Sequence, residues 1–412
     1  MTAPQSTSSR APAWALALLI ALGTALRVAG AFHYRGVPYD IESLRIVGQS
    51  LREHPGHVYV THRWPYGPVY FPFAALASVL SSTWHLAFSG LIRMPVVLAD
   101  AVSAWLVADL LRLRGQSRRR QLLGAALVAL GPIPVLIVVA HGQIDGFAFC
   151  FVVAALWAWQ RQGSRRALVC GLLLGLGAAT KTTPLFCVFA FLPVCAGLKE
   201  RLQLVASAVA VPLLLLVPWL VTEPGQVKTA LTMNKGVPGF GSWSLLVQPS
   251  LADVWIGHVK VAASAATKAV TQQQNLIVAA AVLLLAPVLW RAKLHPARAA
   301  ALLYLVVDLV NPNLSYQYLI WMALPLAAAG MVAESVLLSA VFVVPAWILY
   351  FRPHGLTRPS LYLALAALSW LVLLAVCVRE GVRLRAGTSS DDPGEEGPGR
   401  RSTVGDVQGL QT

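Results

Sequence analysis

The sequence predicts an all-α membrane protein: a polytopic bundle of about 10–12 transmembrane helices. The chain has 412 residues, of which 57% are hydrophobic and 12% are charged, and its mean hydropathy is positive. A water-soluble fold of this size could not bury so much apolar surface. Apolar segments of about 18 to 22 residues, the length that crosses a bilayer, recur from Ala13 to Cys377.

Twelve apolar segments are candidate spans. In order they are residues 13–32, 86–111, 121–140, 145–161, 166–180, 184–197, 202–221, 275–290, 298–311, 316–333, 335–350 and 359–378. The polar step from Lys181 to Pro184 predicts broken or tilted helices on either side of it. Residues 13–378 then form one transmembrane domain between an N-terminal tail, 1–12, and a disordered tail, 386–412, which has little apolar surface.

Arginine and lysine gather in every second loop, which predicts the orientation. The clusters are Arg112 to Arg120, Arg161 to Arg166, Lys199 with Arg201, Arg291 to Arg298, and Arg379 to Arg385. Basic loops face the cytoplasm. We therefore expect a plasma (inner) membrane protein with both termini cytoplasmic and two long outer loops, 33–84 and 222–274.

The net charge of +15 does not indicate nucleic-acid binding, because the cations lie between apolar runs and not along one polar face. The five cysteines fall inside apolar segments without metal-ligand spacing. They predict neither a disulfide framework nor a zinc site.

The first outer loop contains an apolar repeat at helical spacing. Ile41, Leu44, Val47 and Leu51 share one face, and polar residues fill the other. This pattern predicts an amphipathic helix lying on the membrane, and a site that receives lipid-linked substrates would gain from such a helix beside its entrance.

Polar residues from five loops are expected at the outer ends of the helices, where they would line one polar cleft. They are Asp40, Glu42, His62, Arg63, His141, Gln143, Asp145, Lys181, Asn311, Asn313 and Gln317.

Structural roles compete with this interpretation. Asp40 and Asp145 each stand where a helix N-cap is expected. Glu42 has the i,i+3 spacing for an ion pair with Arg45. Lys181 could extend its amine to phosphate headgroups.

Three further features of the sequence have possible structural roles. Arg93 and Asp100 lie seven residues apart and are expected to pair inside the membrane. Asp308 is a candidate buried charge. The aromatic stretch 64–72 is either an interfacial belt or a surface for sugar or prenyl packing.

Four motifs follow one another along the chain: the acidic pair in Tyr39–Glu42, the segment His62–Pro68, the pair His141–Asp145 and Gly175–Pro184, and the late segment Asn311–Trp321. In this order they resemble the family-C glycosyltransferases (GT-C), including the first mannosyltransferase of GPI anchors and actinobacterial mannosyltransferases. The second acid is Glu42, where the GPI enzyme has Asp. The resemblance spans most of the chain and implies sugar transfer from a polyprenyl-phosphate donor.

The resemblance implies roles for these residues. Asp40 would be the general base, and Glu42 would orient the acceptor or support Asp40. Lys181 and Arg63 would hold the phosphate. The remaining candidates, which would contact sugar or donor, are His141, Gln143, Asp145, Asn311, Gln317 and Tyr318. A raised pKa would suit Asp40 as a base. We expect no obligate metal, although an acidic pair can bind a divalent cation.

The sugar is expected to be mannose, with arabinose and other sugars as alternatives, and the acceptor a cell-envelope glycolipid, polysaccharide or protein. A multispan transporter or lipid flippase is the main alternative function, because broken helices and intramembrane charges also mark transport pathways. A scaffold role is the third.

Overall fold

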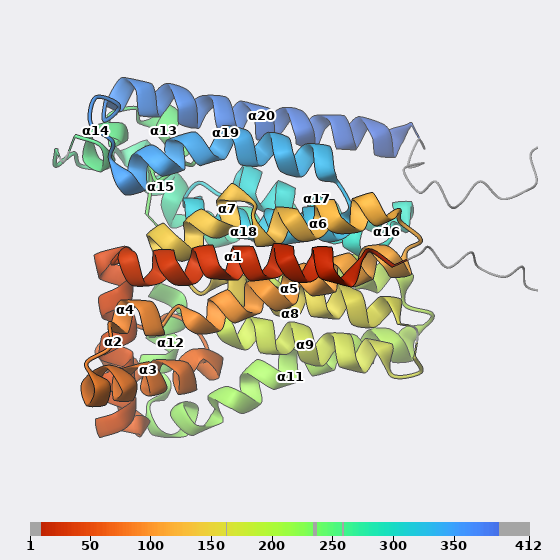
Figure 1. Ribbon diagram of the computed structural model, residues 1–412, viewed down its shortest axis with the longest axis horizontal. Coiled ribbons are helices and arrows are strands. Elements are labelled where there is room, and N and C mark those ends of the chain that lie inside the picture. The colour runs from red at the N-terminus through yellow and green to blue at the C-terminus, as the bar shows by residue number, and fades with distance from the viewer. Residues whose placement is uncertain (1–9, 162, 234–236, 258, 387–412) are drawn as a thin grey trace, which may run out of the picture.

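The computed structural model describes residues 10–161, 163–233, 237–257 and 259–386, and every regular element in these ranges is helical (Figure 1). Each of the twelve predicted apolar segments contains at least one helix. They are α1 (Ala13–His33), α4–α5 (Phe88–Leu91, Met94–Leu113), α6–α7 (Arg118–Ala129, Pro132–Leu136), α8 (Asp145–Gln160), α9 (Arg166–Thr180), α10 (Val188–Phe191), α11 (Leu198–Thr222), α16 (Gln274–Ala292), α17 (Pro296–Val310), α18 (Leu319–Ala329), α19 (Val332–Phe351) and α20 (Pro359–Arg385).

Seven helical segments in the described ranges are long and apolar enough to cross a membrane, counting α4–α5 and α6–α7 each as one. The predicted all-α polytopic bundle is confirmed. The helix α20 continues to Arg385, beyond its predicted end. The proposed tails fall mostly on residues 1–9 and 387–412, which lie outside the described part of the chain.

The predicted break after the fifth span is also confirmed. The helix α9 ends at Thr180, Lys181 is extended, and 3-10 turns η5 (Thr183–Cys187) and η6 (Leu192–Val194) flank the single turn α10. Glycine lets α9 approach α11 closely, because a Cβ at Gly171 would lie 2.4 Å from the carbonyl oxygen of Leu204. The break therefore sits on a tightly packed helix pair.

The expected pair of Arg93 and Asp100 is wrong. Asp100 accepts a hydrogen bond from Nε of Arg27 at 2.8 Å, which joins α1 to α5. Arg93 instead donates to the carbonyl oxygens of Ala31 and Val139. Asp100 lies one helical repeat from Arg93, but Arg27 of a neighbouring helix is nearer, and spacing along one helix could not reveal it.

The first outer loop folds into helix α2 (Pro38–Glu53), three 3-10 turns, η1 (Pro55–His57), η2 (Tyr59–Thr61) and η3 (Pro68–Tyr70), and helix α3 (Phe71–Trp84). The amphipathic helix is present, but its expected orientation toward the membrane is wrong. Ile41, Leu44 and Val47 are buried within the protein, and a Cβ at Gly48 would lie 2.4 Å from the carbonyl oxygen of Ala74 in α3. The apolar face of α2 packs on α3.

The second long loop contains α12 (Pro224–Met233), α13 (Ser244–Val247), α14 (Leu251–Trp255) and α15 (Ala265–Gln272). Figure 1 shows α2, α3, α12 and α14 at one end of the bundle, and the start of α1 with the end of α20 at the other. The basic clusters lie at that second end, where Arg112 pairs with Asp109 and Arg166 with Glu200. The two ends of the molecule therefore differ in charge and in architecture.

Candidate active site

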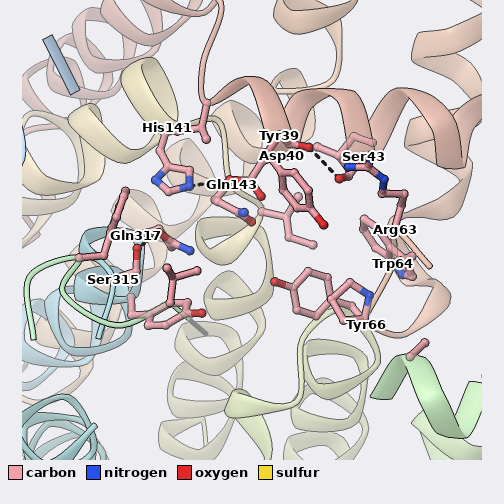
Figure 2. Close-up of a pocket in the computed structure, with 18 of the residues that line it drawn as sticks. Tyr39, Asp40, Ser43, Arg63, Trp64, Tyr66, His141, Gln143, Ser315 and Gln317 are labelled. Carbon is pink, nitrogen blue, oxygen red and sulfur yellow. Dashed lines mark hydrogen bonds and ion pairs between the residues drawn. The ribbon is translucent and has the colours of Figure 1, made fainter. Parts of the chain in front are cut away.

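A cavity of about 490 Å³ opens at the end of the bundle that carries the long loops (Figure 2). Its walls come from α2, from the segment 62–66, from the turn ending at His141, from α12 and α14, and from the segment before α18. The polar residues that line it are Tyr39, Asp40, Ser43, His62, Arg63, Tyr66, His141, Gln143, Ser315, Gln317 and Tyr318. Residues more than 270 positions apart in the sequence thus share one cavity.

Asp40 is the carboxylate in the cavity wall. It lies in the first turn of α2, whose N-terminal dipole favours a negative charge. The capping interpretation is wrong, because the N-cap position is Val37 and no side chain caps the helix. Oδ2 of Asp40 lies 2.8 Å from Nε2 of His141, and its side chain is 23% exposed. Asp40 is thus held in place while open to the cavity.

His141 is fixed on both sides of its ring. Its Nδ1 lies 2.6 Å from the Tyr350 hydroxyl, and its Nε2 faces Asp40. The π-helical turn η4 (Ile137–His141) ends here, and Gly142 follows with a φ of 84°. Because the Asp40 carboxylate is an acceptor, Nε2 of His141 donates to it, and the contact with Tyr350 holds the other side of the ring.

The environment of Asp40 lowers its pKa below the ordinary value. Burial by itself raises the pKa, but the hydrogen bond and charge of His141, the hydrogen bond from Gln143 and the charge of Lys181 together outweigh it. The expectation of a raised pKa is therefore wrong, because partners that favour the carboxylate surround Asp40. The group stays ionised at neutral pH.

Glu42 lies outside the cavity lining. Its half-exposed carboxylate is 3.7 Å from Nε of Arg45, as the i,i+3 spacing predicted. The expected support of Asp40 by Glu42 is not found. Residues two positions apart on a helix have their side chains on different faces. Asp40 therefore lines the cavity, whereas Glu42 lies on the surface.

Lys181 and Asp145 form a buried ion pair behind the cavity. Nζ of Lys181 lies 2.8 Å from both carboxylate oxygens, and Nε1 of Trp321 donates to Oδ1 at 2.6 Å. The ammonium also lies 4.9 Å and 5.0 Å from the ring centres of Tyr66 and Tyr318, which line the cavity. Neither Lys181 nor Asp145 lines the cavity, so their predicted substrate contacts stay predictions.

Arg63 is the arginine in the cavity lining. Its guanidinium carbon lies 4.8 Å from the centre of the Tyr39 ring, and no carboxylate pairs with it among the residues that the structure describes. Further along this segment, a Cβ at Gly67 would lie 2.2 Å from the carbonyl oxygen of Ala179, so the chain presses against the end of α9. The aromatic segment thus packs inside the protein and presents Arg63 to the cavity.

The late segment contributes part of the floor. Gln317 accepts a hydrogen bond from the hydroxyl of Ser315, and Tyr318 stacks on Trp321 with ring centres 4.2 Å apart. Asn311 is fully buried and accepts from the backbone amide of Asn313. It lies outside the cavity lining, and its contact with substrate stays a prediction.

Six of the ten predicted site residues line the cavity: Asp40, Arg63, His141, Gln143, Gln317 and Tyr318. Sequence reasoning missed Tyr350 as a partner of His141, and Phe240 and Trp255 as wall residues. Tyr350 is one aromatic residue in an apolar helix, which carries no signal of its own. Phe240 and Trp255 belong to the long outer loop, whose proximity to Asp40 the sequence did not show.

No group of three or more potential metal-ligating residues occurs in the described ranges. The independence of activity from a metal stays a prediction.

Comparison with known proteins decides the class of enzyme. The model of glycosyltransferase family 87 matches residues 64–312, well over half of the chain. The chain belongs to glycosyltransferase family 87. The matched residues include Trp64, His141, Lys181 and helix α17. Asp40 and Arg63 lie before the match. The predicted resemblance to multispan glycosyltransferases is confirmed at the family level, and membership in family 87 favours an enzyme over the transporter alternative.

Two solved structures match most of this chain at low sequence identity. ArnT from Cupriavidus metallidurans, bound to undecaprenyl phosphate, is 14% identical with a TM-score of 0.49, covering 90% of this chain and 72% of its own. The Archaeoglobus fulgidus oligosaccharyltransferase is 14% identical with a TM-score of 0.45, covering 88% of this chain. The present chain spans 55% of that archaeal enzyme's length. No curated protein matches the sequence. This family 87 chain is an integral membrane protein.

Proposed function

We propose that this glycosyltransferase moves a sugar, mannose in the first instance, from a polyprenyl-phosphate donor to a cell-envelope acceptor, a glycolipid or polysaccharide. The observation that carries the proposal is Asp40, an ionised carboxylate open to a cavity and held by His141. A glycosyl transfer needs such a base to take the proton from the acceptor hydroxyl.

The reaction uses Asp40 and Arg63, which both line the cavity. The acceptor oxygen bonds to the anomeric carbon as the bond between that carbon and the donor phosphate oxygen breaks. Asp40 takes the hydroxyl proton, and Arg63 stabilises the charge that accumulates on the departing phosphate. Lys181 and Asp145 support the aromatic floor from behind, and Gln143 and Gln317 offer amides to sugar hydroxyls.

The cavity end of the molecule is proposed to face away from the cytoplasm, in the plasma membrane. The support is the gathering of arginines at the opposite end, where the positive-inside rule places the cytoplasm. Both chain termini would then be cytoplasmic. A cysteine introduced at Arg35, near the cavity end, should react with a membrane-impermeant thiol reagent in intact cells, and one at Arg119 should not.

The direct test is transfer of radiolabelled mannose from polyprenyl-phosphate mannose to membrane acceptors by the purified protein in liposomes. Transfer from this donor, with none from a nucleotide-linked mannose, supports the proposal. Transfer from the nucleotide donor alone contradicts the donor class. Transfer of arabinose and not mannose from a polyprenyl phosphate corrects the sugar and leaves the mechanism. Unchanged transfer in EDTA agrees with the expected independence from metal.

Arg63→Gln should lower kcat/KM for the donor by about 10- to 100-fold, because a charge-assisted contact to the phosphate is lost. Initial rates at varied donor concentration measure the effect. Arg35→Gln is the matched control, since Arg35 is exposed at the same end and does not line the cavity. Equal loss in both variants contradicts a specific role for Arg63.

His141→Phe should move the acid limb of the kcat/KM profile to higher pH. The change removes the hydrogen bond and charge that lower the Asp40 pKa, while burial, which raises it, remains. Because Asp40 must be deprotonated to act as a base, a higher pKa means that activity is lost at a higher pH as the solution is acidified. A profile measured from pH 4 to 9 tests this, and a shift toward lower pH contradicts the assignment.

A further inference from the structure

A second cavity, of about 620 Å³, lies at the opposite, basic end of the bundle. Helix α17 forms one wall, with Leu302 and Leu305, and α16 and α20 form the others, with Leu285, Val288 and Leu384. Helices α16 and α20 each pack on α17. The result is an apolar cleft between two helices that are long and apolar enough to span the membrane.

Two arginines line the cleft. Arg291 from α16 and Arg385 from α20 are exposed, and neither pairs with a carboxylate among the described residues. The acidic residue that lines the cleft is Glu380, whose buried carboxylate lies 3.1 Å from Arg298 and 2.8 Å from Arg383. The negative charge of Glu380 is therefore already paired with Arg298 and Arg383, and no carboxylate in the described residues balances Arg291 and Arg385.

The surrounding charges reinforce this imbalance. Arg379 and Arg383 are shared between Glu380 and Glu334, so positive residues outnumber acidic ones around the cleft. An apolar groove that ends in uncompensated cations matches a ligand with a hydrocarbon chain and an anionic head.

We propose that this cleft binds an anionic phospholipid of the adjacent leaflet. One acyl chain lies along the apolar walls between α16 and α20, and the phosphate lies at Arg291 and Arg385. A free phosphate ion would leave the long apolar walls uncovered, which favours a lipid. Figure 1 places this end of α20 away from α2, whose residues line the first cavity, so the site is separate from the proposed chemistry.

Gly381 offers a way to block the cleft without disturbing the fold. It lines the cavity, and a Cβ built on it meets no heavy atom within 4 Å. A phenylalanine there would fill the space of the acyl chain. Because the position lies inside helix α20, replacing glycine should also not weaken the helix.

The experiment measures binding of phosphatidylglycerol and phosphatidylcholine to the full-length protein in detergent micelles by native mass spectrometry. The wild type should bind phosphatidylglycerol more tightly. The double variant R291Q/R385Q should lose about 30-fold in that affinity, since each cation near an anionic lipid contributes about fivefold. Arg119→Gln, which removes an exposed arginine outside the cleft at the same end, should leave it unchanged.

Gly381→Phe should abolish tight binding while the delipidated protein keeps its wild-type Tm. Equal affinity for the two lipids, an equal loss in Arg119→Gln, or undiminished binding in a folded Gly381→Phe protein would each overturn the proposal. So would displacement of the lipid by inorganic phosphate at a similar concentration, because the apolar chain would then add nothing.

Discussion

Asp40→Asn should lower the rate of sugar transfer by about 100- to 10,000-fold, the range expected when a general base is removed. The amide keeps the shape of the side chain and can still contact Nε2 of His141, but it cannot take the proton of an acceptor hydroxyl. The loss should appear in kcat, with little change in donor KM, because Asp40 acts on the acceptor in the transition state.

Glu42→Gln provides a matched control on the same helix. It neutralises a carboxylate two residues away that is half exposed and paired with Arg45. The variant should transfer sugar at close to the wild-type rate. Comparable losses in the two variants would mean that α2 needs both acids, and wild-type transfer by folded Asp40→Asn would exclude Asp40 as the base.

The length of the apolar runs predicted most of the bundle. Membrane-spanning helices satisfy their own backbone hydrogen bonds, so a run of apolar residues is nearly sufficient evidence for each one. The break at Lys181 was also predictable, since Pro184 and the polar residues around it interrupt the helical pattern.

Partnerships between helices were not predictable in the same way. Asp100 pairs with Arg27 and not Arg93, and the apolar face of α2 covers α3 and not lipid. In both cases the residue type was recognised correctly, but the partner depends on which helices become neighbours. His141 and Asp145 are close in sequence, yet one faces Asp40 and the other Lys181, because the turn at Gly142 separates them.

Lys181→Met should destabilise the protein by about 3–5 kcal/mol, the cost of leaving one member of a buried ion pair without its partner. Asp145 is fully buried, and in the described part of the chain Trp321 would remain as its side-chain hydrogen-bond donor. We expect a large fall in Tm and in the yield of monodisperse protein, measured by fluorescence-detected size exclusion. A small change would mean that water or a substrate group reaches the site.

The double variant Asp145→Leu with Lys181→Met separates structure from catalysis. Replacing both members of a buried pair by apolar residues is often close to neutral for stability, so the double variant should recover most of the lost Tm. If Lys181 only supports Tyr66 and Tyr318 from behind, sugar transfer should recover with the fold. If transfer stays low in a stable double variant, the ammonium must leave Asp145 during the reaction and hold the donor phosphate, as the sequence motif first indicated. The free energy of the ion pair between Lys181 and Asp145 would then oppose donor binding. The paired arrangement would be the state without donor, and donor binding would break the pair.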